Sequence, residues 1–292
     1  MATLKNRRSQ NIPGEFYVDS TCIDCDTCRW LTPYIFHRRD HKSAVYHQPE
    51  TSLERRGALQ ALLACPTASI GTVKPPKDIQ NIQAEFPLKI VENIYYCGYH
   101  SNKSFGAASY FIQHPEGNVL IDSPRFNPPL VKRLATMGGV KYIYLTHRDD
   151  VADHQKFHDY FGGDRLLHID DLTEETQNIE IILEGKETIT FLKDIQIIPV
   201  PGHTKGHTIL LYKKQYLFTG DHLAFSASIG GLTGFRNFCW YSWEEQIQSM
   251  KKLLHYPEIS WILPGHGRRY HRDPVTMQQD LKQCIQTMES LQ

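Results

Sequence analysis

Histidine and aspartate residues gather in four short segments that each follow an apolar run. These segments are residues 146–154, 201–204, 219–222 and 264–267. In an α/β layer the carboxyl ends of the strands present ligand sites, so we expect the four segments to meet in one pocket. Neutral imidazole nitrogens and anionic carboxylate oxygens suit a pair of divalent or trivalent metal ions, with one carboxylate able to bridge them.

Four of the seven cysteines also have ligand spacing. Cys22, Cys25 and Cys28 form C-x2-C-x2-C in one loop, and Cys65 is followed at once by Pro66. Three thiolates from one loop and one from a distant segment can surround a cubane cluster without straining the backbone. Zinc sites usually pair C-x2-C with a second such pair or with histidines, which a single further cysteine does not supply. We therefore expect a 4Fe-4S cluster, with structural zinc, buried structural cysteines or a module without a cluster as the alternatives.

The composition excludes several classes of partner. The chain has 292 residues with 32 basic and 32 acidic side chains, so no global field favours nucleic acid or an anionic membrane surface. No apolar run is long enough to span a bilayer, and residues 1–10 do not resemble a secretory signal. We expect a soluble protein of the cytoplasm, or of the plastid stroma if a transit peptide has been removed.

The pattern along the chain predicts two domains. Residues 14–73 contain the cysteine loop, an extended piece at 16–18, a second at 43–46 and a helix over 52–64. Residues 74–86, with Pro75 and Pro76, have the composition of a linker. Residues 87–292 alternate strand-length apolar runs with helical patterns, which indicates an α/β domain. The predicted strands include 109–112, 119–121, 142–145, 195–200, 216–218 and 261–263. Ser242 and Glu245 predict the start of a helix.

These motifs resemble two known families. The cysteine spacing over residues 14–73 is similar to that of single-cluster bacterial ferredoxins, which implies a small α+β domain. The order of the histidine and aspartate segments over residues 89–270 resembles the metallo-β-lactamase superfamily, which implies an αββα sandwich. By that resemblance the metal ligands are His147, Asp149, Asp153, His154, His203, Asp221 and His266, with Asp221 as the bridge. Asp122 looks like the family's early aspartate, which supports the ligands without binding metal.

The first metal motif departs from the family pattern. The usual H-x-H-x-D-H is replaced by H-x-D-x3-D-H, with two additional residues and an aspartate in place of the second histidine. The insertion leaves open whether Asp149 or Asp150 is the ligand, and also whether Asp153 and His154 stay in contact with the metals. A carboxylate at that place resembles the flavodiiron branch, and added oxygen ligands favour iron over zinc. We therefore expect two iron ions, with two zinc ions as the alternative.

Several other residues of the second domain have two interpretations. His207 and His222 adjoin ligand positions, and we expect them either to support the ligands or to line the pocket. Arg268 and Arg269 are either an anchor for an anionic substrate group or a plain surface pair. The aromatic-rich stretch 225–243 is either a lid over the metals or part of the core.

The joint presence of both motifs favours an oxidoreductase, because zinc has no redox chemistry that a ferredoxin-like module could serve. In this hypothesis the cluster relays electrons to a di-iron site, with Asp221, Asp149 and His266 as the catalytic residues. An external ferredoxin or reductase would donate electrons, the substrate would be a small molecule, and a homo-oligomer is compatible with the sequence. The runner-up is a metal-dependent hydrolase of an ester, lactone or thioester, with a structural or sensing cluster. A non-enzymatic metal carrier is the third alternative.

Overall fold

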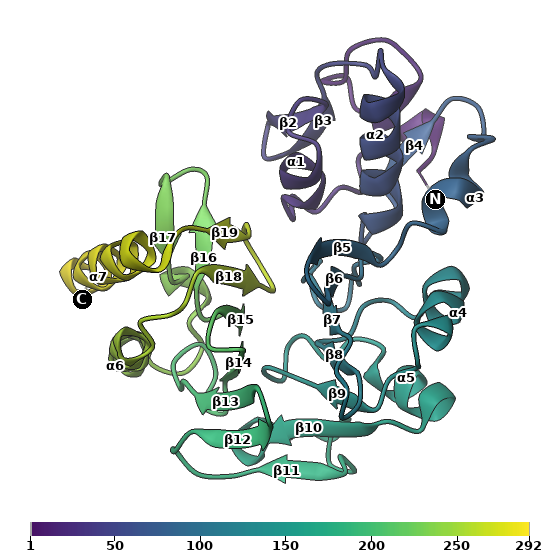
Figure 1. The fold of residues 1–292 in the computed structure, drawn as a ribbon. Helices are drawn as coiled ribbons and strands as arrows, with labels where there is room; N and C mark the ends of the chain where they lie inside the picture. The colour runs from purple at the N-terminus through teal and green to yellow at the C-terminus, as the bar shows by residue number, and fades with distance from the viewer. Residues whose placement is uncertain (1, 292) are drawn as a thin grey trace.

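The N-terminal domain is a small α+β unit in this computed structural model, which describes residues 2–291. Two antiparallel hairpin-like pairs flank the helices of this domain (Figure 1). Its elements are η1 (Leu4–Asn6), β1 (Phe16–Val18), α1 (Thr27–Leu31), β2 (Phe36–Arg39), β3 (Lys42–Val45), α2 (Ser52–Ala64) and β4 (Ile70–Thr72). Strand β1 pairs with β4, and β2 pairs with β3. We call this unit the cluster domain.

Helix α2 has the predicted bounds, and its first turn explains why it begins there. The Thr51 side chain accepts a hydrogen bond from the Glu54 N–H, and the Glu54 carboxylate accepts one from the Thr51 N–H. This capping box satisfies two amide groups that a helix start leaves free. The helix ends at Cys65, so it delivers the fourth cysteine toward the loop that holds the other three.

The segment expected to be a linker is ordered and packed. It contains α3 (Ile79–Gln83), and the Ile82 side chain is buried in the core. Arg55 of α2 binds the Asp78 carboxylate at 2.8 Å, next to the start of α3. The prolines therefore mark the entry to a short helix that is held against α2, because apolar burial and an ion pair outweigh the local composition.

Seven strands form the first sheet of the second domain, in the order β11-β10-β9-β8-β7-β6-β5. Strands β8, β9, β10 and β11 run parallel, and the others pair antiparallel. The strands are β5 (Leu88–Val91), β6 (Ile94–Tyr96), β7 (Tyr110–Ile112), β8 (Val119–Ile121), β9 (Tyr142–Tyr144), β10 (Asp164–His168) and β11 (Ile181–Leu183).

Six strands form the second sheet, in the order β12-β13-β14-β15-β18-β19. Its only parallel pair among the described residues joins β15 to β18. The strands are β12 (Ile189–Leu192), β13 (Ile195–Pro199), β14 (Thr208–Tyr212), β15 (Tyr216–Gly220), β18 (Trp261–Pro264) and β19 (Tyr270–His271). A separate hairpin, β16 (Ala224–Ser226) with β17 (Gly231–Thr233), follows β15.

The two sheets face each other, and helices cover their outer sides (Figure 1). One core fills the space between the sheets, and a second lies between the six-stranded sheet and its helices. Helices α4 (Pro128–Thr136) and α5 (His154–Phe161) lie on the first sheet, and α6 (Trp243–Lys252) and α7 (Pro274–Ser290) lie on the second. The domain also contains three short 3-10 helices: η2 (Ile169–Asp171), η3 (Arg236–Phe238) and η4 (Leu253–His255). This arrangement confirms the expected αββα sandwich.

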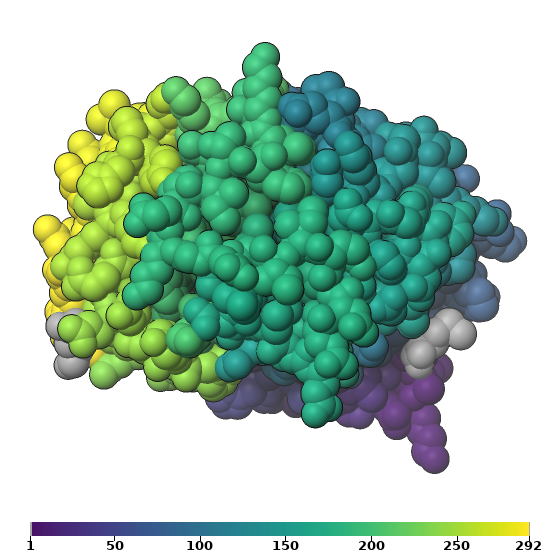
Figure 2. All heavy atoms as spheres, turned by 90° about the horizontal axis from the view of Figure 1, so that it is seen from below, coloured from purple at the N-terminus to yellow at the C-terminus, as the bar shows by residue number. Residues whose placement is uncertain are grey.

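The two halves of the sandwich form a continuous surface on the side away from the cluster domain. Figure 2 shows the teal and green segments meeting there, with the purple N-terminal residues visible only at the edge. Within residues 2–291, no helix is both long and apolar enough to cross a membrane. The predicted strands at 119–121, 142–145, 195–200, 216–218 and 261–263 correspond to β8, β9, β13, β15 and β18. Each of these strands is followed within four residues by Asp122, His147, His203, Asp221 or His266, respectively.

We expect Phe218→Ala to lower the free energy of unfolding of the protein by about 3–5 kcal/mol. Phe218 is fully buried on β15 and its ring lies 5.3 Å from that of Tyr110 on the opposite sheet, so its loss leaves a cavity between the sheets. Chemical denaturation followed by circular dichroism measures the change. Tyr160→Ala, at a position that is 56% exposed, is the control and should change stability by less than about 1 kcal/mol. Equal effects of the two substitutions would contradict the assignment of the core.

Candidate metal centres

Three histidines surround one oxygen of Asp221. The Nε2 atoms of His147, His203 and His266 lie 3.8, 3.7 and 3.8 Å from Asp221 Oδ2. These separations are too long for hydrogen bonds. Two ligands that share a tetrahedral ion at about 2.0–2.2 Å lie roughly 3.3–3.6 Å apart, so these separations are slightly wider than those around a bound ion and a small inward movement would close them on a metal. Asp221 follows the last residue of β15 and is placed where a bridging carboxylate is needed.

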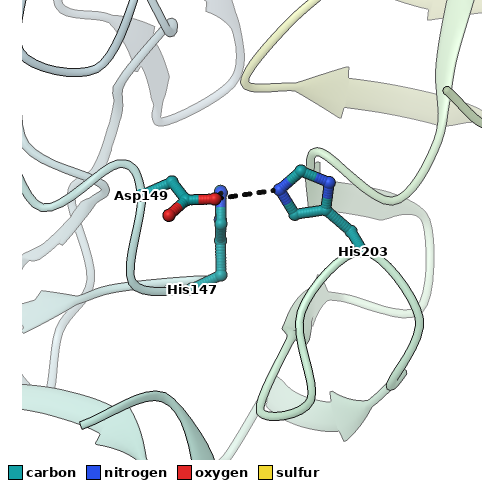
Figure 3. A group of neighbouring side chains, drawn as sticks. All are labelled: His147, Asp149 and His203. Carbon is teal, nitrogen blue, oxygen red and sulfur yellow. Dashed lines mark ion pairs between the residues drawn. The ribbon is translucent and has the colours of Figure 1, made fainter. Parts of the chain in front are cut away.

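Asp149 and Asp150 point to different sides of this arrangement. Asp149 Oδ2 lies 3.3 Å from His203 Nε2 and 4.0 Å from His147 Nε2, as Figure 3 shows for this trio. Asp150 Oδ1 lies 3.9 Å from His266 Nε2. Two overlapping groups result, one with His147, Asp149 and His203, and one with His147, Asp150 and Asp221. The sequence leaves the choice between Asp149 and Asp150 open, and the structure brings both aspartates to the site.

The unsatisfied atoms of the site fit bound metal ions. His147 Nε2, Asp150 Oδ2 and Asp221 Oδ1 are buried and have no hydrogen-bond partner. A side chain at Gly265 would place a Cβ 2.8 Å from Asp150 Oδ2 and 3.0 Å from Asp221 Oδ1, so the backbone leaves a cradle around these oxygens. Buried polar atoms without partners are costly, and cations held between them would remove that cost.

The protonation states also suit metal binding. Burial raises the pKa of Asp150 well above its usual value, and the neighbouring Asp221 raises it further. Burial lowers the pKa of His147 to about 4, so its ring is neutral at physiological pH and can offer a lone pair. The contact with His203 lowers the pKa of Asp149. Cations placed among these groups would favour the ionised form of all three carboxylates.

A hydrogen-bonded chain behind His147 fixes the orientation of its ring. Asp122 accepts hydrogen bonds from the Thr146 N–H at 2.8 Å and from the Thr146 hydroxyl at 3.0 Å. The Thr146 hydroxyl is also 2.9 Å from His147 Nδ1, which leaves Nε2 facing the site. Asp122 therefore supports the ligand from outside the metal site, as the resemblance implies.

Asp171 has a comparable supporting role that the sequence does not reveal. Its buried carboxylate accepts hydrogen bonds from the Arg148 N–H, the Thr204 hydroxyl and the Gly206 N–H. It thereby ties the segment after β9 to the segment after β13, which carry different ligands. Asp171 lies in η2 at a distance from every recognisable motif, and only the fold brings it to these two segments.

Asp153 and His154 do not join the ligand group, which corrects the expected ligand set. The Asp153 carboxylate accepts hydrogen bonds from the Phe126 N–H at 2.9 Å and from Lys103 at 3.3 Å. His154 is the first residue of α5, and its pKa is lowered to about 4 by burial and then by Arg165. The two additional residues in this motif move the Asp-His pair onto the helix start, and Asp150 occupies the site instead.

His207 and His222 are fully buried and do not line the pocket, so of the two expected roles they have the supporting one. The His207 ring stacks on His147 at a centroid distance of 4.8 Å, and its Nε2 accepts a hydrogen bond from the Asp221 N–H. A Cβ at Gly220 would meet His207 Nε2 at 2.9 Å, and this glycine has a φ of +48°. Close packing behind the ligands thus fixes both His147 and the backbone of Asp221.

The four cysteines of the cluster domain line one small cavity. Cys22, Cys25, Cys28 and Cys65 are all free and surround it together with Pro66, Val18, Ile23 and Ile70. The Ser69 N–H donates to Cys65 Sγ at 3.2 Å. Burial raises the pKa of Cys25 to about 11, so the thiolates need a compensating charge, which the iron of a cluster would supply. The residues therefore fit a cubane.

The second domain packs directly against the cluster loop. A Cβ at Gly106 would lie 3.0 Å from both Cys25 Cβ and Pro66 Cγ, so glycine allows this approach. His100 Nδ1 is 2.6 Å from the Gly106 carbonyl oxygen and 3.1 Å from the Thr27 hydroxyl. Ala108, two residues after Gly106, donates its N–H to the carbonyl of Gly265, which precedes the ligand His266. Residues 106–108 thus connect the cysteine loop to the segment that contains His266.

Arg268 and Arg269 also join the two domains. The sequence instead suggested either an anchor for an anionic substrate group or a plain surface pair. Arg268 Nε lies 3.0 Å from Asp26 Oδ2 in the cluster loop. The Arg269 guanidinium lies over the rings of Trp30 and Tyr96, 4.7 and 5.1 Å from their centroids. Neither side chain is an isolated surface charge, because the cluster domain supplies the Asp26 carboxylate for Arg268 and the Trp30 ring for Arg269.

A cleft of about 960 Å³ opens above the metal site, between the two domains. Its lining includes Asp149, Asp150, His203, Asp221 and His266 from the second domain. The cluster domain contributes a second wall, and aromatic residues of the 225–243 stretch contribute a rim. The exposed fractions of Phe238 and Trp240 are 56% and 57%, so this part of the stretch borders the cleft and does not fill the core.

Residues 92–287 match the family model described as "Metallo-beta-lactamase superfamily". The chain belongs to the metallo-beta-lactamase superfamily. Residues 18–72 match the model "4Fe-4S single cluster domain of Ferredoxin I", which agrees with the cysteine cavity. Membership in the superfamily implies a metal-dependent enzyme with a two-metal site, and the N-terminal match implies a 4Fe-4S cluster.

Curated relatives of the superfamily match half of the chain. The hydroxyacylglutathione hydrolase of Photorhabdus laumondii is 33% identical over 159 residues, which is 51% of this chain and 57% of the relative. The protein of the same name from Hamiltonella defensa is 36% identical over 159 residues, with the same coverage. The chain thus spans a little over half the length of these relatives.

Solved structures of the superfamily share the fold. The DIM-1 metallo-beta-lactamase aligns with a TM-score of 0.53 at 19% identity, covering 68% of this chain and 95% of that one. A metallo-beta-lactamase from Pontibacter korlensis aligns with a TM-score of 0.51 at 17% identity, covering 69% and 97%. The αββα fold is therefore common to this chain and both of these proteins.

We expect Asp150→Asn to lower the metal content of the second domain, and Asp153→Asn to leave it unchanged. An amide is a much weaker ligand than a carboxylate, and only Asp150 faces the site. Elemental analysis of the purified variants, corrected for the cluster iron measured with sulfide, gives the ions bound per chain. Loss of metal in the Asp153→Asn variant with retention in the Asp150→Asn variant would show that the family positions, and not this geometry, define the ligands.

Proposed function

We propose that this protein is a metal-dependent hydrolase of esters, lactones or thioesters. The observation that carries the proposal is the position of Asp221 Oδ2 among three histidine nitrogens, with Asp149 and Asp150 completing two groups on the floor of an open cleft. When bound there, two ions would supply Lewis acidity and a nucleophilic water at neutral pH. The curated relatives named as hydroxyacylglutathione hydrolases support hydrolysis over the oxidation chemistry expected from the joint motifs.

The site residues that are exposed to the cleft are those that a bound substrate would contact. The side chains of Asp149 and His266 are 42% and 23% exposed, while that of His147 is fully buried. Asp149 faces the cleft and would accept the proton of the attacking water. His266 lies at the cleft wall, where it would position the carbonyl group of the substrate. Asp221 would hold the attacking water in line with that group.

The ligand atoms of the site bear on whether the two ions are zinc or iron. Three carboxylates in one site add oxygen ligands and favour harder ions such as iron or manganese, whereas hydrolysis itself needs no redox-active metal. We propose two iron ions, with zinc as the alternative, and a cluster that has a structural or sensing role. The geometry supports such a role because the cluster loop contacts Gly106 and Arg268 beside the site.

An oxidoreductase with an intramolecular electron relay is the second candidate. One observation favours it: Cys25 of the cluster cavity lines the same cleft as Asp149 and His266. This arrangement would place a one-electron centre near the two-metal site. The test below separates the two candidates, because hydrolysis consumes water and no electrons.

We expect the anaerobically purified holoprotein to hydrolyse at least one of 4-nitrophenyl acetate, a γ-lactone and a hydroxyacylglutathione. Asp221→Asn should lower kcat/KM by roughly 100-fold or more, because the group that holds the attacking water is lost. Asp159→Asn, on the exposed face of α5, is the matched control and should leave kcat/KM unchanged.

The same assay separates hydrolysis from redox turnover. Hydrolysis should proceed with the cluster either oxidised or reduced, and chelation of the two ions should abolish it. No hydrolysis by fully metallated protein, together with oxygen consumption when the cluster is reduced, would contradict the hydrolase and support the oxidoreductase.

A further inference from the structure

The cleft over the metal site is built by both domains. Pro33, Phe36, His37 and Arg38 of the cluster domain line it opposite the segments that carry the metal ligands. The His37 ring stacks on Tyr46, and its Nε2 accepts a hydrogen bond from Arg39. Partial burial and the charge of Arg39 lower the pKa of His37, so this wall presents a neutral ring. A substrate in the cleft would therefore contact the cluster domain as well as the hydrolytic domain.

Three exposed aromatic rings stand at the mouth of the cleft beside metal histidines. Phe105, Phe238 and Trp240 are each 56–57% exposed. The Phe105 ring lies 6.3 Å from His266, and the Trp240 ring lies 6.1 Å from His203 and 6.0 Å from Phe238. Exposed large apolar side chains that gather around a concave site are typical of a surface that binds an apolar ligand.

These rings are held in place by backbone contacts. The N–H groups of Trp240 and Tyr241 donate to the carbonyl oxygen of His203 at 2.8 and 3.1 Å. Phe105 belongs to the turn that ends at Gly106, which packs on Cys25. The backbone of the rim is thus fixed to a proposed metal ligand on one side and to the cluster loop on the other, so little loop entropy would be lost on binding.

Each cation that lines the cleft is already paired with a carboxylate, and Arg29, Arg38 and Arg268 share Asp24 and Asp26. All of the lining residues lie in the described part of the chain, and the Lys and Arg among them each have a carboxylate partner. The pairs are Arg29 with Asp24 and Asp26, Arg38 with Asp24, Lys103 with Asp153, and Arg268 with Asp26. Recognition of an anionic group needs a cation that is free to pair with it, and this cleft offers none from its side chains.

We propose that the cleft selects neutral substrates with an apolar, aromatic group next to the hydrolysed bond. The aromatic group lies between the rings of Phe105, Phe238 and Trp240 and the wall of the cluster domain. Multiply charged leaving groups are disfavoured, because Asp24 and Asp26 of the cluster loop occupy the arginines that would bind them. The inference rests on the proposed hydrolase, whose site it places at the floor of the same cleft.

The test measures equilibrium binding of two non-hydrolysable probes to the holoprotein by calorimetry. Benzanilide is a neutral amide analogue of an aryl ester, and 4-benzamidobenzenesulfonate is the same molecule with one negative charge on a group that binds metals weakly. We expect benzanilide to bind at least about tenfold more tightly, since the anion gains no free cation in the cleft. Trp240→Ala should weaken benzanilide binding about tenfold, whereas Tyr160→Ala, on the exposed part of α5, should not change it.

A variant that removes one negative charge from the cleft tests the charge argument separately. Asp26 has a φ of +65°, a conformation that asparagine tolerates well, so Asp26→Asn should keep the loop intact. The substitution removes the charge that neutralises Arg268, and we expect binding of the sulfonate to strengthen about fivefold while benzanilide binding stays the same. An unchanged sulfonate affinity in a folded, cluster-loaded variant would overturn the charge argument.

Three results would overturn the proposal: tighter binding of the sulfonate by the unmodified protein, no effect of Trp240→Ala, or no binding of either probe. These readouts do not depend on turnover. Failure of the hydrolase would instead appear as normal benzanilide binding without hydrolysis of any neutral aryl ester, and that result would leave the selectivity of the cleft established.

Discussion

The crowding of three carboxylates around a few histidine nitrogens is the constraint on which the rest of the structure depends. Asp149, Asp150 and Asp221 meet on the floor of the cleft, and several of their oxygens and neighbouring nitrogens have no hydrogen-bond partner. Such a group is unstable where it is largely buried unless cations share it. The carboxylates are brought together because five strand ends of the two sheets converge there, and α/β layers place their ligand sites at such strand ends.

The supporting residues explain how the group stays in position. Thr146 and Asp122 orient His147, and Asp171 fixes the segments that carry Asp149 and His203. Gly220 and Gly265 allow the backbone to approach within contact distance of His207 and of the carboxylates. The cluster domain extends the same support, since Gly106 and Arg268 connect its cysteine loop to the segments around His266. The cysteine cavity therefore adjoins the cleft, which Cys25 also lines, and the cluster domain is a structural part of that cleft.

Much of this arrangement follows from local patterns in the sequence. The pair Ser242 and Glu245, the apolar strand runs and the C-x2-C-x2-C spacing are short-range signals, and each predicted an element or a grouping of side chains that the structure contains. The first metal motif was different, because two additional residues changed which aspartates face the site. The family resemblance assigned Asp153 and His154 as ligands, whereas the start of α5 turns them away and Asp150 takes their place. Asp171 and the partners of Arg268 depend on contacts between distant segments, which no periodicity encodes.

The most direct test of the central claim is a crystal structure of the holoprotein with anomalous difference maps at the iron and zinc edges. We predict two separate peaks beside Asp221 Oδ2, one bordered by His147, Asp149 and His203 and the other by Asp150 and His266. Ordered water with no anomalous signal at both positions, in crystals whose cysteine cavity contains its cluster, would contradict the claim that these carboxylates are held together by metal ions.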